Sequence, residues 1–404
     1  MTEVAYVFER FPSFGQTFCY REVEELERQG VTVHVYSIRR PVNEPVESWN
    51  PEIVRRVRYL PDEATLTREI DDATRRHQLA PHIEKALQQW GRQPDFLRLF
   101  QAIHIGRELE QKKLRHVHAH FAGMAVRTAY WINQFFPVSY SFTAHANDIF
   151  APRDFTISLA KIMDSAAAVV TVSDFSASFL KQKFPAAAPK IRRIYNGIDL
   201  DRFSPATFVQ TPPLILSIGR LIEKKGFSDL IAACVILKEH GREFTCEIVG
   251  EGPLEAELRS QISDGQLHDD VRLSGPSLQA EIAAKLAAAT VFVLPSVREE
   301  GGGMDNLPTV IAEAMAAGLP VISTPVAGVP EMVAHESNGT LVSEHDPRAI
   351  CAAIERLMDN PTRAREQGRA GREIAEAKFS IKNSARELAR LYEEALRIKD
   401  ASRT

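Results

Sequence analysis

The segment GGGMDNLPTVIAEAMAAG (301–318) constrains the fold of this chain more than any other feature of the sequence. Apolar runs at 291–295 and 320–323 flank the segment, and each has the length and composition of a buried strand. Apolar residues in its second half recur with the period of a helix, for which Pro308 suits the first turn and Gly318 the C-terminal cap. The pattern predicts strand, glycine-rich loop, helix and strand in succession, which is the building unit of an α/β sheet.

The same loop has the composition of an anion site. Main-chain N–H groups at the start of a helix bind anions, and here they belong to the residues around Gly303, Asn306 and Leu307. Asp305 lies just before the helix, and Glu313 follows eight residues later, away from the apolar stripe. Amides that bind phosphate and two carboxylates that hold sugar hydroxyls together predict a nucleotide-sugar site.

Composition limits the class of protein. A chain of 404 residues is too long for one ordinary core, so we expect two domains. The sequence is 44% hydrophobic and 25% charged, which is typical of a soluble globular protein, and its net charge of −4 gives nucleic-acid binding no support. Four widely spaced cysteines without a CxxC pair indicate reduced thiols and a cytoplasmic protein.

The N-terminus and the apolar runs bear on membrane targeting. The opening MTEVAYVFERF is interrupted by acidic residues and Arg10, so it is predicted to be a strand and not a signal peptide. No apolar run approaches the ~18 residues that a membrane-spanning helix needs. We therefore expect a soluble or peripherally bound protein.

Strand-like and helix-like segments alternate twice along the chain. The first series runs from Val4 to the turn-rich stretch NGIDLDRFSP, and the second starts again with PLILSIG. Residues 41–112 lean towards helix without a clear pattern. We predict two doubly wound domains, 1–203 and 204–382, with a C-terminal helix at about 383–404 that packs back on the first, and a ligand cleft at the carboxyl ends of the strands.

Two cations flank the loop GRLIEKKG, which directly follows the strand PLILSIG. Arg220 and Lys225 at a strand end, beside a helix N-terminus, would neutralise a diphosphate. A solvated basic loop is the alternative, and Lys224 competes with Lys225 for the lysine role.

Gly250 and Gly252 lie between the strand FTCEIVG and a helix that is expected to open at Pro253. They can approach a donor closely, although many strand-to-helix turns need glycine for backbone reasons alone. The chain has neither GxGxxG nor GxxxxGK[ST]. That absence argues against a nicotinamide dinucleotide site and against a P-loop.

Histidines mark the ends of two predicted strands in the first half. His145 ends YSFTAH, where it either hydrogen-bonds a substrate or serves as a core or capping residue. His116, His118 and His120 alternate along HVHAHF and share one strand face. Because no Cys or HExxH lies nearby, a zinc site is disfavoured, and we expect structural roles for His116 and His118 with His120 near the cleft.

The triplet Asp199-Leu200-Asp201 spells DxD, a metal-binding motif in one class of glycosyltransferases. It lies in the turn NGIDLDRFSP, shortly after an Asn-Gly. Turn chemistry explains these aspartates better than a metal site does.

Several stretches together resemble the retaining glycosyltransferases of family 4, which have the GT-B fold. They are GRLIEKKG, VGEGP, AEAMAAGLPVISTPVAGVPEMV, IYNGIDLDRFSP and SFTAHANDI, and they extend over most of the chain. The opening RFPSFGQTF is similar to the branch that builds exopolysaccharides, including colanic-acid-type enzymes. The resemblance implies an α/β protein with two Rossmann-like domains that face each other across a cleft.

The resemblance also implies roles for particular residues. Arg220 and Lys225 would bind the donor diphosphate, and Glu313 the ribose hydroxyls. Gly15 would let the backbone approach the reacting sugar, which His145 would contact near its C6 hydroxyl. The family usually has a glutamate where this chain has Asp305, followed by Asn306 in place of glycine. The shorter aspartate changes the reach to the sugar's 3- and 4-hydroxyls.

The implied reaction moves a sugar from a UDP- or GDP-linked donor to an acceptor hydroxyl with retention, without a metal or a cofactor. The acceptor would be a sugar or a lipid-linked glycan. For a lipid-linked acceptor, candidates for peripheral contact with the inner face of a membrane are the basic residues Arg55, Arg56, Arg58, Lys112, Lys113 and Arg115. A solvated charged face is the commoner explanation of such clusters. Two alternatives stay open, a nucleotide-sugar epimerase on the same fold and an inactive nucleotide-sugar-binding scaffold.

Overall fold

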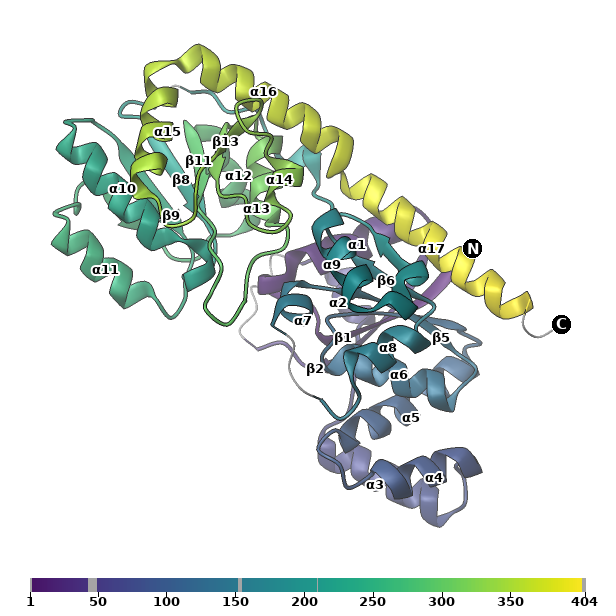
Figure 1. Cartoon of the computed structure of the whole chain (residues 1–404). Coiled ribbons are helices and arrows are strands. Elements are labelled where there is room, and N and C mark those ends of the chain that lie inside the picture. Colours follow the sequence, from purple (N-terminus) through teal and green to yellow (C-terminus); the bar gives the residue numbers. More distant parts are fainter. Residues whose placement is uncertain (1, 43–48, 152–154, 209, 402–404) are drawn as a thin grey trace. The chain divides into compact units, whose positions relative to one another are not determined.

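The computed structural model describes residues 2–42, 49–151, 155–208 and 210–401, and the chain divides into two compact units (Figure 1). Residues 402–404 of the predicted C-terminal helix lie outside the described part. Unit 1 comprises Met1–Val172, Ala177–Ile194 and Ser384–Thr404, and unit 2 comprises Ser173–Ser176 and Tyr195–Asn383. Each unit is built on one parallel sheet.

Unit 1 contains a seven-stranded sheet in the order β3-β2-β1-β4-β5-β6-β7. Every neighbouring pair of its strands is parallel. The strand order reverses direction between β1 and β4, which is the topological switch point where open α/β sheets bind ligands. The strands are β1 (Glu3–Arg10), β2 (Thr32–Arg39), β3 (Arg58–Tyr59), β4 (His116–His120), β5 (Ser139–Ala144), β6 (Ala168–Thr171) and β7 (Ile191–Arg193).

Two apolar cores cover the two faces of this sheet. Along β1 the side chains alternate, so Tyr6 and Phe8 belong to one core and Ala5 and Val7 to the other. The first core also contains α1 (Thr17–Arg28), α2 (Pro51–Arg56) and the C-terminal helix α17 (Ile381–Ala401). The second contains α3 (Glu63–Arg75), α4 (Pro81–Trp90), α5 (Phe96–Gln111), α6 (Met124–Phe135), α8 (Leu159–Ser165) and α9 (Asp174–Lys183).

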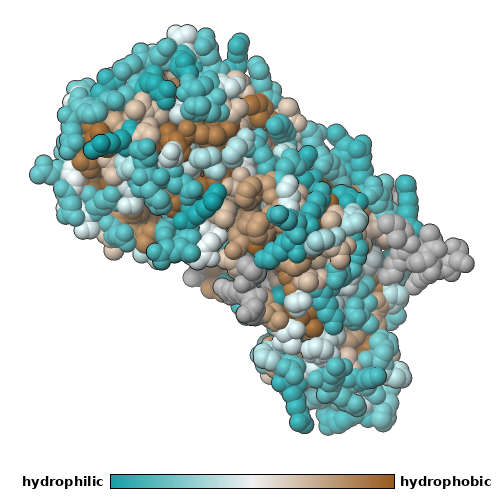
Figure 2. Space-filling model, viewed as in Figure 1, coloured by the Kyte–Doolittle hydropathy of each residue, from teal (hydrophilic) through white to brown (hydrophobic). Residues whose placement is uncertain are grey.

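The helices α3 and α4 occupy the stretch whose pattern is unclear in the sequence. Each buries one narrow apolar side, with Leu66 and Ile70 on α3 and Ile83 on α4. Their remaining surface is mainly hydrophilic on the face that Figure 2 shows. A narrow apolar stripe on a short helix gives a weak periodic signal, which explains why the individual helices are hard to delimit from the sequence. No helix of the described chain is both long enough and apolar enough to cross a membrane.

Unit 2 contains a six-stranded parallel sheet in the order β10-β9-β8-β11-β12-β13, and its switch point lies between β8 and β11. The strands are β8 (Leu214–Ile218), β9 (Thr245–Val249), β10 (Val271–Leu273), β11 (Val291–Leu294), β12 (Val321–Ser323) and β13 (Gly339–Leu341). The helices are α10 (Phe227–Glu239), α11 (Glu255–Asp264), α12 (Gln279–Ala288), α13 (Thr309–Ala316), α14 (Val329–Met332), α15 (Pro347–Asp359) and α16 (Pro361–Lys378).

Two helix starts differ slightly from the prediction. Pro308 precedes α13 as its N-cap and is not in its first turn, and α11 begins at Glu255, two residues after Pro253. Gly318 adopts a positive φ of 68° just after α13, as a helix-ending glycine does. The predicted α/β class with two doubly wound domains is confirmed.

Candidate functional site

The loop after β8 reaches the loop after β11, so the switch point of unit 2 brings together segments about 80 residues apart. A short 3₁₀ turn, η5 (Glu223–Lys225), ends at Gly226, whose φ is 66°. A Cβ on Gly226 would lie 1.8 Å from the carbonyl oxygen of Pro295. The loop can therefore pass this close to the end of β11 only because residue 226 has no side chain.

Two lysines of this turn meet Asp305. The Lys225 ammonium donates a hydrogen bond to Oδ2 of Asp305, and Lys224 Nζ lies 3.6 Å from Oδ1. All three side chains are between 12% and 14% exposed. Burial raises the pKa of the Asp305 carboxyl, but the charges of Lys225 and Lys224 outweigh it and hold that pKa below its usual value. The predicted sugar-binding carboxylate and the predicted diphosphate-binding lysine thus lie in direct contact.

This cluster predicts an acid-dependent effect of Asp305→Asn. Losing a hydrogen bond to a charged group should lower the free energy of unfolding by about 1–3 kcal/mol at neutral pH. Because the folded-state pKa is depressed, the contribution of Asp305 is present above its unfolded pKa and disappears as the pH falls through the lower folded value. Urea unfolding of both proteins from pH 7 to pH 3 should show the difference shrinking below about pH 4. A difference that stays constant or grows in acid would contradict the pairing.

Arg220 differs from the two lysines in its surroundings. It is exposed, and among the described residues its guanidinium has no hydrogen-bond or ion-pair partner. It follows Gly219 at the end of β8, at the same switch point as Lys225. An unpaired cation at this place is available to a diphosphate.

Gly250 and Gly252 lie against this segment backbone to backbone. A Cβ on Gly250 would lie 1.9 Å from the carbonyl oxygen of Gly219, and one on Gly252 would lie 2.5 Å from that of Leu221. Leu221 N also donates to the Glu251 carbonyl at 2.9 Å. The glycines therefore support the loop that carries Arg220, while their direct contact with a donor stays a prediction.

The side chain of Asn306 is committed to a buried network. Its Oδ1 accepts a hydrogen bond from Ser173 Oγ at 2.5 Å, and its Nδ2 donates to Ser176 Oγ at 3.0 Å. Asn306 is 4% exposed and Leu307 is 7% exposed. Their predicted role in donor binding would thus rest on main-chain N–H groups. The two serines, far away in the sequence, gave no signal that could have identified them.

Asn306→Ala should lower the free energy of unfolding by about 1–3 kcal/mol, because it leaves two buried hydroxyls without the amide they bond. The exposed amide of Gln89 provides a control, and Gln89→Ala should change stability by less than about 0.5 kcal/mol. Chemical unfolding curves measure both. Equal effects of the two substitutions on the free energy of unfolding would show that the hydrogen bonds of Asn306 do not contribute to stability.

Two further residues that are predicted to bind the nucleotide-sugar donor lie on or near α13. Glu313 is on the helix itself and is 4% exposed. Gly303 accepts a hydrogen bond from Glu299 N at 2.8 Å, and a Cβ on Gly303 would lie 2.1 Å from Glu299 Oε2. Glu299 is thus a carboxylate of the loop that the sequence pattern did not single out.

In unit 1, His120 at the end of β4 and His145 just after β5 are hydrogen-bonded neighbours. His120 Nδ1 lies 3.2 Å from His145 Nε2, and His120 Nε2 lies 3.0 Å from Oε1 of Glu22 on α1. The rings of His145 and Phe121 are 4.2 Å apart between centroids. Glu22 was not predicted, because a single acidic residue on an amphipathic helix has no distinctive sequence context.

A cavity of about 390 Å³ opens at the carboxyl ends of β1 and β4, which is the switch point of unit 1. His120 lines it together with Arg10, Ser13 and Asp148, among other residues. Gly15 lies in the turn η1 (Phe14–Gln16), where a Cβ would meet no atom of the described residues within 4 Å. The backbone at Gly15 is therefore open to close approach.

The remaining strand histidines have hydroxyl partners on both ring nitrogens. His116 bonds Ser139 and Ser141, and His118 bonds Ser141 and Thr143, at 2.8–3.1 Å. Burial and the neighbouring histidines lower the pKa of His118 well below its usual value. Glu22, His118 and His120 are close enough to share a metal ion, but the hydroxyl partners satisfy His118 without one. This geometry favours a structural role for His116 and His118.

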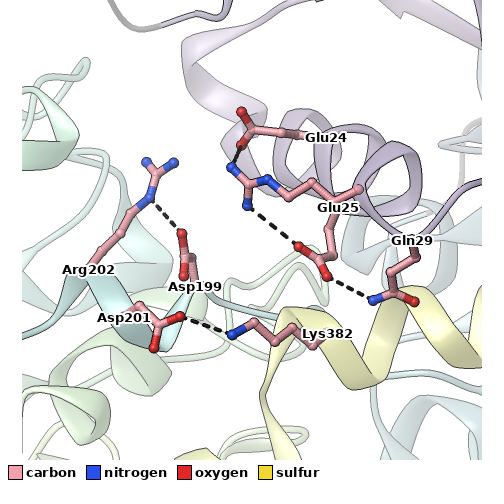
Figure 3. Close-up of polar contacts among 8 residues, drawn as sticks. Glu24, Glu25, Gln29, Asp199, Asp201, Arg202 and Lys382 are labelled. Atoms are coloured by element: carbon pink, nitrogen blue, oxygen red, sulfur yellow. Dashed lines mark hydrogen bonds and ion pairs between the residues drawn. The ribbon is translucent and has the colours of Figure 1, made fainter.

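Figure 3 shows the DxD turn in unit 2 with each aspartate in an ion pair. Asp199 accepts a hydrogen bond from Arg202 Nε at 3.0 Å, and Asp201 accepts one from Lys382 Nζ at 3.0 Å. Both carboxylates have cationic partners within the turn and the start of α17, as a structural turn requires.

Comparison with known proteins gives the class to which these sites belong. Residues 15–202 match the family model "Glycosyltransferase Family 4", and residues 201–374 match the model "Glycosyl transferases group 1". The chain belongs to glycosyltransferase family 4, and its two units are the Rossmann-like domains of the GT-B fold.

Particular relatives lie among polysaccharide enzymes. The chain is 38% identical over 208 residues to the amylovoran biosynthesis glycosyltransferase AmsK of Erwinia amylovora (51% of each chain). It is 40% identical over 229 residues to the putative colanic acid biosynthesis glycosyltransferase WcaL of Escherichia coli (56% of each chain). The chain thus spans about half the length of the curated relatives it matches. The solved structure of Anabaena HepE in complex with UDP shares the fold, with a TM-score of 0.72 at 17% identity over 98% of this chain and all of that one.

Proposed function

We propose that the protein is a glycosyltransferase that moves a sugar from a nucleoside-diphosphate sugar to an acceptor hydroxyl in the synthesis of an exopolysaccharide or another cell-surface glycan. The observation that carries the proposal is the Lys225–Asp305 contact beside the unpaired Arg220, at the switch point of unit 2. The names of the two curated relatives support a role in polysaccharide synthesis.

The roles of the unit 2 residues follow from their chemistry. Arg220 and Lys225 would bind the diphosphate, and the N–H groups before α13 would add positive potential. When the diphosphate binds Lys225, Asp305 would lose this partner and become available to the hydroxyls of the sugar. Lys224 would stay near Asp305. Glu313 would hold the ribose of a UDP- or GDP-linked donor.

The reaction would proceed with retention and without a metal. The leaving group is a diphosphate, so the main requirement is stabilisation of developing negative charge, and two cations together with main-chain amides would meet it. The leaving phosphate would accept the proton of the acceptor hydroxyl in a front-face reaction. The acceptor, a sugar or a lipid-linked glycan, would bind unit 1 near Gly15, His120 and His145, and peripheral contact with a membrane would give access to a lipid-linked one.

A donor screen tests the proposal. Thermal unfolding with a panel of UDP- and GDP-sugars should identify one that stabilises the protein by about 2.7 kcal/mol at 100 times its dissociation constant. Nucleotide release with that donor and an acceptor extract, followed by analysis of the anomeric configuration, should then show a transferred sugar with retained configuration. An altered sugar without an acceptor would indicate an epimerase, and binding without release an inactive scaffold.

A further inference from the structure

A chain of buried polar side chains in unit 1 runs from the C-terminal helix to His145. The hydroxyls of Tyr392 on α17 and Tyr6 on β1 share a hydrogen bond, and Tyr6 Oη donates to Glu22 Oε1 at 2.7 Å. Glu22 Oε1 lies 3.0 Å from His120 Nε2, and His120 Nδ1 lies 3.2 Å from His145 Nε2. None of the five side chains belongs to a residue more than 8% exposed.

The donors along this chain follow from what each group can offer. An ionised carboxylate only accepts hydrogen bonds, so both Tyr6 and His120 must donate to Glu22. The single proton of Tyr6 is then used, and Tyr392 must donate to Tyr6. His120 carries a proton on Nε2. The remaining choice is the direction of the bond between His120 Nδ1 and His145 Nε2.

The charge of the cluster decides that direction. A buried carboxylate needs a compensating cation, and the imidazole of His120 lies against Glu22. Burial would lower the pKa of His120, but the contacts with Cys19 and Glu22 outweigh it and raise that pKa. Burial raises the pKa of the Cys19 thiol itself, and the Glu22 carboxylate lies 3.0 Å from His120 Nε2 as its ionic partner. Burial and the charge of His120 lower the pKa of His145 well below its usual value.

We propose that His120, held by Glu22, is a positioning residue that fixes His145 as the neutral tautomer with its proton on Nδ1. His120 then carries a proton on both ring nitrogens, and its Nδ1–H donates to His145 Nε2. His145 is left with one proton, on Nδ1, and can donate a hydrogen bond only from that atom.

The consequence for catalysis rests on the proposed function. A neutral imidazole can donate to a hydroxyl of the donor sugar without placing a positive charge beside an oxocarbenium-like transition state. A protonated His145 would oppose that charge, and the Nε2–H tautomer would direct its proton towards His120 and away from the sugar.

Nuclear magnetic resonance of the full chain tests the proton positions without any substrate. In protein labelled with ¹⁵N in the histidine rings, each signal can be assigned by replacing one histidine at a time. At neutral pH, we expect two protonated nitrogens on His120 and one on His145, at Nδ1. Glu22→Gln should convert His120 to the neutral imidazole and shift the ring proton of His145 from Nδ1 to Nε2. Ser139→Ala removes a hydrogen-bond partner of His116, which does not belong to the series from Tyr392 to His145. This variant should leave the signals of His120 and His145 unchanged.

Two results would overturn the proposal: a neutral His120 in the wild-type protein, or a His145 tautomer that is the same in Glu22→Gln. Since these spectra need no donor, they stand even if no nucleotide-sugar binds, and such a failure would count against the proposed function alone. If transfer is observed, Glu22→Gln should lower kcat by about 10- to 100-fold with little change in KM, as the loss of an orienting partner does. Ser139→Ala should retain wild-type kcat.

Discussion

Arg220→Ala is expected to lower kcat by about 10²–10³-fold, the effect of losing one preorganised charge donor at a developing anion. The free energy of unfolding should not change, because the guanidinium is exposed and has no partner within the described chain. This separation makes the variant a clean test of diphosphate binding. Steady-state kinetics with the donor found in the screen, beside urea unfolding, would measure both quantities.

A surface arginine provides the matched control. Within the described residues, Arg259 on α11 pairs only with Glu255 one turn earlier, so Arg259→Ala should leave kcat unchanged and should alter stability by less than about 0.5 kcal/mol. Lys225→Ala should lower kcat as much as Arg220→Ala, whereas Lys224→Ala should cost less, because Lys224 is the more distant partner of Asp305. Near-normal turnover in both Arg220→Ala and Lys225→Ala would remove the diphosphate assignment.

Gly226→Ala is expected to destabilise unit 2 by about 2–4 kcal/mol, through both overpacking and backbone strain. The new Cβ would lie 1.8 Å from the carbonyl oxygen of Pro295, and the residue would have to keep a φ of 66°. The neighbouring backbone must move, and Lys225 moves with it. Chemical unfolding should show the loss of stability, and donor binding should weaken in the protein that remains folded.

A second glycine of the site serves for comparison. In the part of the chain that the structure describes, no atom lies within 4 Å of a Cβ built on Gly301, and its φ is not positive, so Gly301→Ala should leave stability within about 0.5 kcal/mol of wild type. If Gly226→Ala were equally mild, the close approach of the β8 and β11 loops would not be a fixed feature of the protein.

Part of the chemistry of the unit 2 site can be predicted from the sequence. The cations of GRLIEKKG and the carboxylate of Asp305 stand out because each lies at a recognisable strand end or just before a helix start. The strand order then places the loops after β8 and β11 side by side. What the sequence could not indicate is the contact between Lys225 and Asp305, since it joins residues on two different loops.

The histidine pair of unit 1 shows the opposite case. The two-residue period of a strand predicts that His116, His118 and His120 share one strand face, but it does not distinguish their roles. Their different surroundings come from other strands and helices: hydroxyls of β5 bond His116 and His118, whereas Glu22 of α1 bonds His120. Glu22 itself resembles any other acidic residue of an amphipathic helix.

Local spacing alone determined the two α/β series, the glycine turns and the basic and acidic loop ends, because periodicity and turn chemistry act between residues near in the chain. The tertiary structure decided which charged groups pair with each other and which histidine lies against a carboxylate. Those properties depend on burial and on partners far away in the sequence, 98 residues apart for His120 and Glu22 and 181 for Asp201 and Lys382. Electrostatic energies in a protein interior are set by distance in space, which the order of residues does not give.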